Sequence, residues 1–534
     1  MLARRRLRAL ATLTLAGALL TACTQPVTGT PQAASNTPAT STAPSSSASS
    51  FPKSTPTYPP VTVPETDFSD CTSILSENNI PVEAALKGKL TLGCAAVEVP
   101  LDYTRPTGTK IKLTVLKIHD SENTHSTGSL LVNPGGPGGS GLDLALGLLS
   151  NFPASVMQHF DMIGFDPRGV GESTPITCAS NKEKDAINAA SPDMSTTAGF
   201  NDAKELAKVF DDDCVKDKGS ELPYFNTENT ARDMDLIRQA VGDDQMNYLG
   251  FSYGTELGAA YAHLFPSKVR VAVLDGAVDP LTNGVQQFAD QLKGFEEAFD
   301  QFAAYCPTSS TCNSLADPRA TAESIEAAAL ASPLSTGSSR KLTASLASTG
   351  ILQALYSRSL WPSLAAALIA GKSGDGSKLL ALADQYTERS SDGTYTNIAD
   401  ANTAISCNDT PAGTPTDATI RATAAKWTTE YPLFGKWAAI SLFSCQQWQP
   451  NRLVPPKPTA PTPTKVLVIG NLHDPATPYQ GAKDLTTTMG NAELLSWDGE
   501  GHTSYLEGSS CVDDYVNNYL ISEKLPPANT TCPK

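Results

Sequence analysis

The sequence predicts an α/β protein in which a mostly parallel sheet carries helices on both faces and an inserted helical cap interrupts the fold. Apolar, strand-like runs alternate with helical stretches between residues 128 and 284. Residues 247–266 have the pattern of a strand, a sharp turn and a helix of small residues. A strand pattern then resumes at Lys465, after a long region of helical periodicity.

Residues 1–22 have the pattern of a secretory signal peptide. Four arginines precede an apolar stretch that ends at Leu20 and is too short for a comfortable membrane span. The sequence Leu20-Thr21-Ala22-Cys23 then resembles the bacterial lipobox, with small residues before a cysteine. We therefore expect a lipoprotein signal, lipidation at Cys23 and a lipid-anchored, extracytoplasmic protein of the cell envelope. An ordinary signal followed by a chance cysteine is the alternative.

Segment 23–65 is rich in Ser, Thr, Pro and Ala and has almost no charge or large apolar side chains. Such a composition cannot form a core, so it predicts a flexible tether. A flexible chain of this length reaches on average ~35 Å.

The other ten cysteines are even in number, which suggests disulfides in an exported protein. No Cys-x-x-Cys pair occurs, so a zinc site is not indicated. Short loops favour pairing of cysteines that are neighbours in the chain. The expected bridges are Cys71–Cys94, Cys178–Cys214, Cys306–Cys312, Cys407–Cys445 and Cys511–Cys532.

Composition excludes several classes of protein. Of the 534 residues, 40% are apolar and 18% are charged, which argues against a disordered chain. A formal net charge of −16 argues against a nucleic-acid binder, which needs a basic face for the phosphates. After residue 22 the sequence has no apolar run of 18 residues, so no downstream transmembrane helix is expected.

Residues 66–284 are predicted to form the first part of the core. Strand-like runs occur at 95–103, 110–118, 129–133, 160–165, 247–251 and 269–275, and 228–242 has helical spacing. Two of these runs open into Gly-rich loops, as is typical of sites at the ends of parallel strands.

Residues 285–455 are Ala-, Ser- and Leu-rich with helical periodicity, and they predict a helical cap. A Pro-rich bridge ends the cap region. The strand pattern that follows predicts that residues 456–534 complete the same core.

Gly250-Phe251-Ser252-Tyr253-Gly254 matches G-x-S-x-G between a strand and a helix. That context is the one a nucleophile elbow requires, because the glycines allow a tight turn that exposes the Ser hydroxyl. We therefore predict Ser252 to be a nucleophile, although so short a pattern also occurs by chance.

A serine nucleophile needs a base and an orienting acid, which follow it in the order Ser, acid, His. His502 lies in a Gly-bracketed loop after a strand, and Asp474 follows the strand that begins at Lys465. These two residues are the predicted base and acid. His473 is expected to be a surface or packing residue, and Asp498 is the rival acid.

An oxyanion hole needs two backbone N–H donors. Tyr253, which follows the nucleophile, is expected to supply one, and Gly136 in the loop Asn133–Gly139 the other. A phosphate-binding loop is not favoured, because no Lys followed by Ser or Thr stands in Walker spacing.

These motifs, LLVNPGGPGGSG, FDMIGFDPRGVGES, NYLGFSYGT and VAVLDGAVDP with the Asp474/His502 pair, resemble those of the prolyl iminopeptidase-like serine peptidases. With the lipobox and paired cysteines, the chain is similar to the actinobacterial secreted and lipoprotein tripeptidyl aminopeptidases over residues 70–532. The resemblance implies an α/β-hydrolase core, a helical cap, a related C-terminal segment and release of short peptides from free N-termini. Pro134 replaces the His of the His-Gly-Gly-Pro loop, which puts any role of that His in doubt but not the Gly136 donor.

The resemblance also implies that cap acids bind the substrate's α-ammonium group. Glu296 and Glu297 are candidates, and a solvated helix face is the alternative for both. The expected function is that of a serine exopeptidase acting on peptides with a free N-terminus, with neither a metal nor an organic cofactor implied. A carboxylesterase or lipase of the same fold shares the triad and is the main alternative, and a binding lipoprotein on an inactive scaffold is a weaker one.

Overall fold

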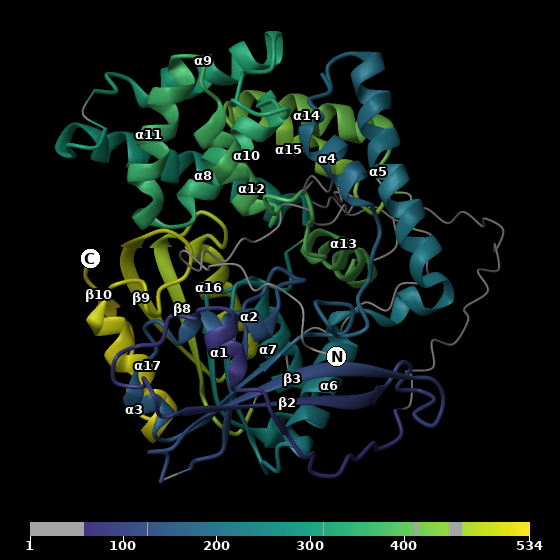
Figure 1. Cartoon of the computed structure of the whole chain (residues 1–534), viewed down its shortest axis with the longest axis vertical. Helices are drawn as coiled ribbons and strands as arrows, with labels where there is room; N and C mark the ends of the chain where they lie inside the picture. The colour runs from purple at the N-terminus through teal and green to yellow at the C-terminus, as the bar shows by residue number, and fades with distance from the viewer. Residues whose placement is uncertain are drawn as a thin grey trace, which may run out of the picture.

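The computed structural model describes residues 58–124, 126–282, 284–312, 314–410, 415–446, 448 and 462–534. Cys23 and its flanking signal and tether lie outside the described residues, apart from the last few residues of the tether. The described chain has two layers, with a sheet and its helices below and a group of helices above (Figure 1).

In the described part of the chain, ten strands form one sheet in the order β1-β2-β3-β5-β4-β6-β7-β8-β9-β10. The first three pairings are antiparallel and the others are parallel. The strands are β1 Ser69–Asp70, β2 Leu90–Pro100, β3 Lys110–Asp120, β4 Ser129–Asn133, β5 Asp161–Phe165, β6 Met246–Phe251, β7 Val269–Asp275, β8 Val466–His473, β9 Ala492–Glu500 and β10 Thr531–Cys532. The predicted α/β fold with a mostly parallel sheet is confirmed.

Helices cover both faces of the sheet, and two separate apolar clusters show it. Leu131 of β4 packs in the cluster that contains α6 and α7, whereas its neighbours Leu130 and Val132 pack with α2 and α17. The core helices are α1 Ser73–Glu77, α2 Gly141–Leu148, α3 Ala154–Met157, α6 Thr227–Ala240, α7 Tyr253–Leu264, α16 Tyr479–Met489 and α17 Ser510–Ser522.

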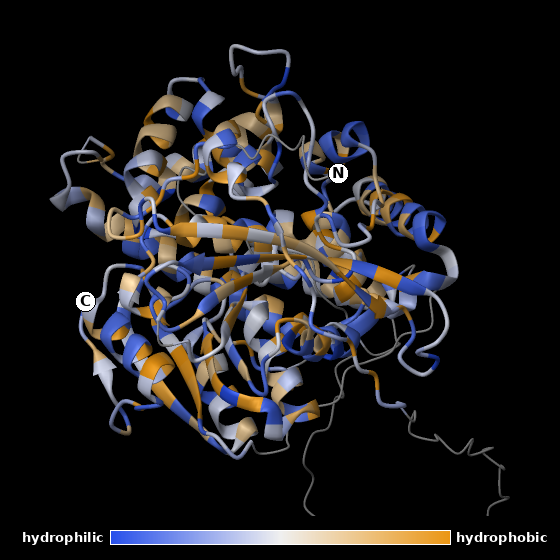
Figure 2. Ribbon diagram, turned by 60° about the horizontal axis from the view of Figure 1, so that its bottom comes forward, coloured by the Kyte–Doolittle hydropathy of each residue, from blue (hydrophilic) through white to orange (hydrophobic). Residues whose placement is uncertain are grey.

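Burial explains why the central strands appear as continuous apolar runs in the sequence. Every residue of β4 and β6 is buried, because helices cover both sides. The long strand β2 instead alternates buried and exposed positions over much of its length. Figure 2 shows the resulting hydrophobic residues along the strands in the middle of the molecule.

The upper layer is the cap, and its helices share an apolar cluster of their own. It comprises α8 Gly284–Tyr305, α9 Pro318–Ala331, α10 Ala344–Leu355, α11 Trp361–Lys372, α12 Ser377–Tyr386, α14 Asp417–Glu430 and α15 Gly435–Ala438. Two earlier helices join it, α4 Asn181–Ala189 and α5 Thr197–Lys218 (Figure 1). Phe200 of α5 packs edge-on against Phe443 at 4.9 Å between ring centroids. The periodicity of residues 181–218 did not reveal this association.

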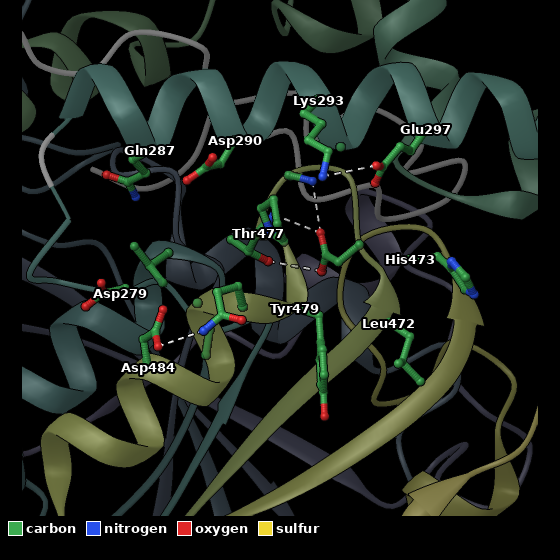
Figure 3. Close-up of a pocket in the computed structure, with 18 of the residues that line it drawn as sticks. Asp279, Gln287, Asp290, Lys293, Glu297, Leu472, His473, Thr477, Tyr479 and Asp484 are labelled. Carbon is green, nitrogen blue, oxygen red and sulfur yellow. Dashed lines mark hydrogen bonds and ion pairs between the residues drawn. The ribbon is translucent and has the colours of Figure 1, made fainter.

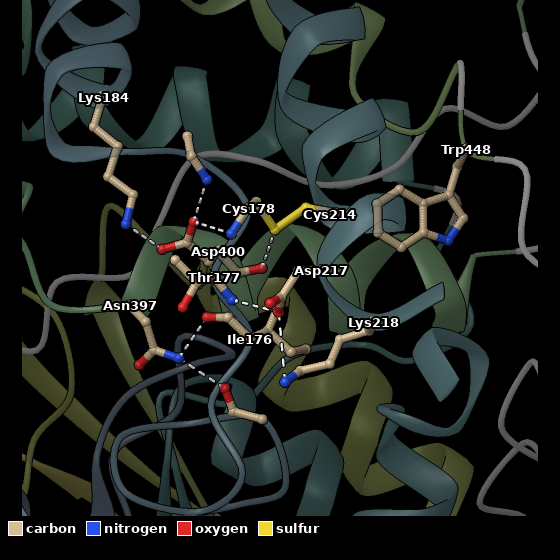
Figure 4. Close-up of a disulfide and its surroundings, with 12 residues drawn as sticks. Ile176, Thr177, Cys178, Lys184, Cys214, Asp217, Lys218, Asn397, Asp400 and Trp448 are labelled. Carbon is tan, nitrogen blue, oxygen red and sulfur yellow. Dashed lines mark hydrogen bonds and ion pairs between the residues drawn. A yellow bond between two sulfur atoms is a disulfide. The ribbon is translucent and has the colours of Figure 1, made fainter. Parts of the chain in front are cut away.

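Helix α13, Ile398–Asp409, lies between the layers and packs with the core cluster through Ala401, Ala404 and Ile405. Its first turn is tied to the loop that follows β5. Asp400 accepts the N–H of Cys178 at 2.8 Å and pairs with Nζ of Lys184. Figure 4 shows Asp400 between these two groups, beside the Cys178–Cys214 bridge.

The structure contains the five predicted disulfides, Cys71–Cys94, Cys178–Cys214, Cys306–Cys312, Cys407–Cys445 and Cys511–Cys532. The pairing of neighbouring cysteines is therefore confirmed. Among the described helices, none combines the length and the apolar character that crossing a membrane requires.

Candidate active site

Ser252 stands in a sharp turn between β6 and α7. Its backbone is at φ 55° and ψ −128°, a region that non-glycine residues rarely adopt. The N–H of Ser252 donates to the carbonyl oxygen of Asp275 on β7 at 2.9 Å, which fixes the turn to the neighbouring strand. This strained strand-to-helix turn is the geometry of a nucleophile elbow.

The glycines of the motif are required by close packing. A Cβ at Gly250 would lie 2.5 Å from the carbonyl oxygen of Gly254, and one at Gly254 would lie 2.9 Å from that of Asn133. Any side chain at either position would force the turn and the adjoining loop apart.

Asp474 and His502 are brought together from the ends of β8 and β9. Nδ1 of His502 lies 2.9 Å from Oδ1 and 3.0 Å from Oδ2 of Asp474. Since an ionised carboxylate only accepts, Nδ1–H is the donor, and the neutral ring then carries its lone pair on Nε2. The Asp474 carboxylate also accepts the backbone N–H groups of Ala476, Thr477 and Thr503 at 2.8–3.0 Å, so its orientation is fixed.

Nε2 of His502 is buried and has no hydrogen-bond partner among the described residues. The ring lies next to the residue that follows β7, because a Cβ at Gly276 would be 3.2 Å from its Cε1. The N–H of Ser252 donates to the carbonyl oxygen of Asp275, the residue that directly precedes Gly276. The end of β7 thus brings the nucleophile turn and the imidazole close together, although no hydrogen bond joins Ser252 to Nε2. Such bonds often tighten only when substrate is bound.

The two rival residues form a separate pair. Nε2 of His473 lies 3.1 Å from Oδ1 of Asp498, and both side chains are substantially exposed. Neither side chain contacts Asp474 or His502 among the hydrogen bonds and ion pairs described. The expectation that His473 is a surface or packing residue agrees with this arrangement.

The loop Asn133–Gly139 packs directly against the nucleophile turn. A Cβ at Gly135 would lie 2.9 Å from the Tyr253 nitrogen and 3.0 Å from the Ser252 Cβ, so the loop can approach only because this residue is glycine. Gly136 follows at φ 110°, and Tyr253 is the first residue of α7, where backbone N–H groups have no partner within the helix. The two expected oxyanion donors therefore lie on segments in contact with each other.

The two candidate cap acids differ in their surroundings. The carboxylate of Glu296 is buried, pairs with Nη1 of Arg319 at 2.6 Å and accepts the N–H of Leu433 at 2.8 Å. Both its oxygens are engaged in holding the cap, so Glu296 is unsuited to bind a substrate amine. Glu297 is 65% exposed and 3.4 Å from Lys293.

A cavity of about 330 Å³ lies between α8 and the turn after β8. Figure 3 shows Lys293 and Glu297 extending from α8 toward the segment that carries Thr477, with Asp279 and Asp484 on the opposite side. The carboxylates of Asp279, Asp290, Glu297 and Asp484 outnumber the cationic groups in its wall. The wall includes Asp474, whereas Ser252 and His502 lie outside it.

Two acidic residues near the nucleophile were not singled out by the sequence. Burial raises the pKa of Asp275 to about 6, the N–H groups of Tyr505 and Ser504 oppose the rise, and the charge of Asp474 adds to it. Burial, followed by the charge of Asp279, raises the pKa of Glu256 on α7 to about 7. The position of Asp275 at the end of a strand beside the nucleophile strand was a usable signal.

A family model described as the alpha/beta hydrolase fold matches residues 128–509, which run from the start of β4 through the whole cap insertion to the residue before α17. Ser252, Asp474 and His502 all lie within the matched range.

Curated relatives are similar over most of the chain. The serine protease Hip1 of Mycobacterium tuberculosis is 38% identical, over 82% of this chain and 87% of its own. Carboxylesterase B of the same organism is 36% identical, over 89% and 91% of the two chains. The tripeptidyl aminopeptidase of Streptomyces lividans is 31% identical, over 82% and 83%.

Proposed function

The chain belongs to the α/β-hydrolase family and is a serine hydrolase, and from this premise we propose that it is an aminopeptidase that cleaves short peptides from free N-termini. Two relatives named as a serine protease and a tripeptidyl aminopeptidase support the peptidase assignment. The observation that carries the mechanism is the Asp474–His502 pair, whose unpartnered Nε2 lies beside the end of β7 that also binds the Ser252 turn.

In this mechanism the Ser252 hydroxyl attacks the scissile carbonyl while Nε2 of His502 takes its proton. Asp474 holds the Nδ1–H and stabilises the imidazolium that forms. The N–H groups of Gly136 and Tyr253 stabilise the oxyanion. The imidazolium then protonates the leaving amine. Water next attacks the acyl-enzyme carbonyl while Nε2 of His502 takes its proton, and return of that proton to Ser252 Oγ breaks the ester bond and releases the acid.

Glu297 is the proposed acid for the substrate's α-ammonium group. Its exposure and its place in the wall of the acidic cavity support this role, whereas Glu296 is already paired. Three extended residues span ~10 Å, so such an amine binds well away from the scissile bond.

We also propose that the protein is extracytoplasmic and anchored by a lipid at Cys23. Five disulfides support an oxidising compartment. The Cys23→Ala variant should no longer incorporate a radiolabelled fatty acid, and unchanged incorporation would refute the anchor.

The relative named carboxylesterase B makes an esterase the second candidate. Matched peptides with free and N-acetylated termini, together with simple acyl esters, decide between the two. A site built for an ammonium group rejects the blocked amine by up to roughly 10⁴-fold in kcat/KM. Equal cleavage of free and acetylated peptides would refute the aminopeptidase, and faster cleavage of esters than of any peptide would favour the esterase.

A further inference from the structure

The loop that carries His502 has an unfavourable backbone. Gly501 is at φ 103°, Thr503 at φ 70° and Leu506 at φ 67°. A β-branched residue such as Thr503 rarely adopts a positive φ, and such a conformation persists only where the surroundings impose it. Contacts from outside the loop must therefore hold it in place.

Asp275 supplies one such contact from the core. Its Oδ2 accepts the N–H of Ser504 at 3.0 Å and that of Tyr505 at 2.8 Å. Its backbone carbonyl accepts the N–H of Ser252 at 2.9 Å. One fully buried residue at the end of β7 therefore binds both the nucleophile turn and the histidine loop.

Tyr356 supplies the other contact from the cap, where it directly follows α10. Its carbonyl oxygen accepts the N–H of His502 at 2.7 Å, and its ring meets the imidazole edge to face at 5.5 Å between centroids. Tyr356 is 3% exposed, and the ring of Phe295 on α8 supports it at 5.3 Å. The loop can come this close because residue 501 is glycine: a Cβ there would lie 2.8 Å from the Tyr356 oxygen.

The cap also touches the turn that carries the catalytic acid. Nε2 of Gln291 on α8 donates to the carbonyl oxygen of Ala476 at 2.8 Å. Gly294, one turn along, packs so closely that a Cβ would lie 2.5 Å from the carbonyl oxygen of Pro475. The histidine and the acid are thus both held from two sides, by the core and by the cap.

We propose that Asp275 and Tyr356 are positioning residues for His502, so that the base is aligned with Ser252 only while the cap is docked on the core. The inference rests on the proposed function, because it assumes that His502 is the base. If Asp275 and Tyr356 act in this way, the cap takes part in catalysis by positioning His502. Burial raises the pKa of the Asp275 carboxyl to about 6, so this residue is ionised above that pH, when it accepts the two loop N–H groups most strongly.

The test compares Asp275→Asn, Tyr356→Leu and Tyr356→Phe in the full chain. A fluorophosphonate titration counts intact sites, and kcat per titrated site is then measured with KM. Misplacing a base by about 1 Å costs roughly 100-fold in rate, so Asp275→Asn and Tyr356→Leu should lose about that much kcat per site with little change in KM. Tyr356→Phe keeps the ring and should recover most of the loss seen with leucine.

Asp498→Asn is the matched control, since it makes the same change in a carboxylate whose hydrogen-bond partner among the described residues is His473. It should leave kcat per site unchanged. If the variants lower only the number of sites or the melting temperature, the residues are merely structural and the proposal fails. If Asp275→Asn does not fold, the comparison of Tyr356→Leu with Tyr356→Phe tests the proposal by itself. Full activity of Ser252→Ala would instead refute the proposed function itself.

Discussion

Nδ1 of His502 lies between the two carboxylate oxygens of Asp474, at 2.9 and 3.0 Å, and both side chains are almost completely buried. Asp474 is itself held by three backbone N–H groups. The carboxylate therefore fixes both the direction of the ring and the nitrogen that carries the proton. The nitrogen left for chemistry is Nε2, which has no partner in the described residues.

The assignment of Asp474 predicts that Asp474→Asn keeps the fold and loses most of kcat. The amide favours the wrong tautomer of the histidine, and the expected loss is about 10⁴-fold. Steady-state kinetics with a peptide substrate measures it, with Asp498→Asn alongside. A near-normal rate for Asp474→Asn combined with loss in Asp498→Asn would show that the other carboxylate is the acid.

Ser252→Ala should abolish turnover, because it removes the hydroxyl that the strained turn holds at the start of α7. Loss of a triad nucleophile costs roughly 10⁴–10⁶-fold in rate. A fluorophosphonate should label the wild type at Ser252, which peptide mapping by mass spectrometry locates. Labelling of the alanine variant to the same extent would rule out Ser252 as the nucleophile.

The two neighbouring glutamates of α8 should behave differently. Glu296→Gln breaks the buried pair with Arg319 and should destabilise the protein by about 2 kcal/mol, without changing the preference for free over acetylated peptides. Glu297→Gln changes an exposed group, so it should leave the melting temperature unchanged and narrow that preference. Chemical denaturation and kcat/KM on both peptide forms measure the two effects. An unchanged preference in Glu297→Gln would remove it as the ammonium-binding acid.

The five disulfides predict that the ten cysteines from Cys71 to Cys532 carry no free thiol in the oxidised protein. Alkylation followed by mass spectrometry counts them, and two or more free thiols would contradict the pairing. Opening the bridge between Cys178 and Cys214, which are 36 residues apart, should cost roughly 4 kcal/mol in the chain-entropy model. Urea unfolding of the double Cys→Ser variant measures that cost.

Asp166 predicts a pH dependence of stability. Burial raises its pKa to about 7, with the N–H of Glu172 and the hydroxyl of Ser140 opposing the rise. The folded state therefore holds this proton more tightly than the unfolded chain does. As the pH rises from about 4 to about 7, the free energy of unfolding should fall, by roughly 4 kcal/mol over the whole window. Asp166→Asn should flatten this decline.

The measurement for Asp166 is the difference in unfolding free energy between wild type and variant at pH 5 and pH 8. The variant loses one accepted hydrogen bond at every pH, so it should be less stable than the wild type at pH 5. Because only the wild type loses stability as Asp166 ionises, this difference should narrow or reverse at pH 8. A gap that does not depend on pH would show that Asp166 ionises normally.

Local sequence was sufficient for the features that depend on neighbouring residues. Gly250, Ser252 and Gly254 mark a turn because their backbone conformations and close contacts are set within a few positions. The central strands were recognisable because burial on both faces leaves only apolar side chains. The cysteine pairs were predictable because each bridge closes a loop of 6 to 38 residues.

Only the tertiary structure decided the features that join distant segments. Adjacent residues on a helix point about 100° apart, so the pattern of α8 could not show that Glu296 faces Arg319 while Glu297 faces the cavity. The contacts of Asp275 and Tyr356 with the His502 loop span more than 140 residues of chain, and periodicity identifies an apolar face without naming its partner. The sequence was therefore enough to predict which groups react, and the packing of cap on core decided which groups hold them.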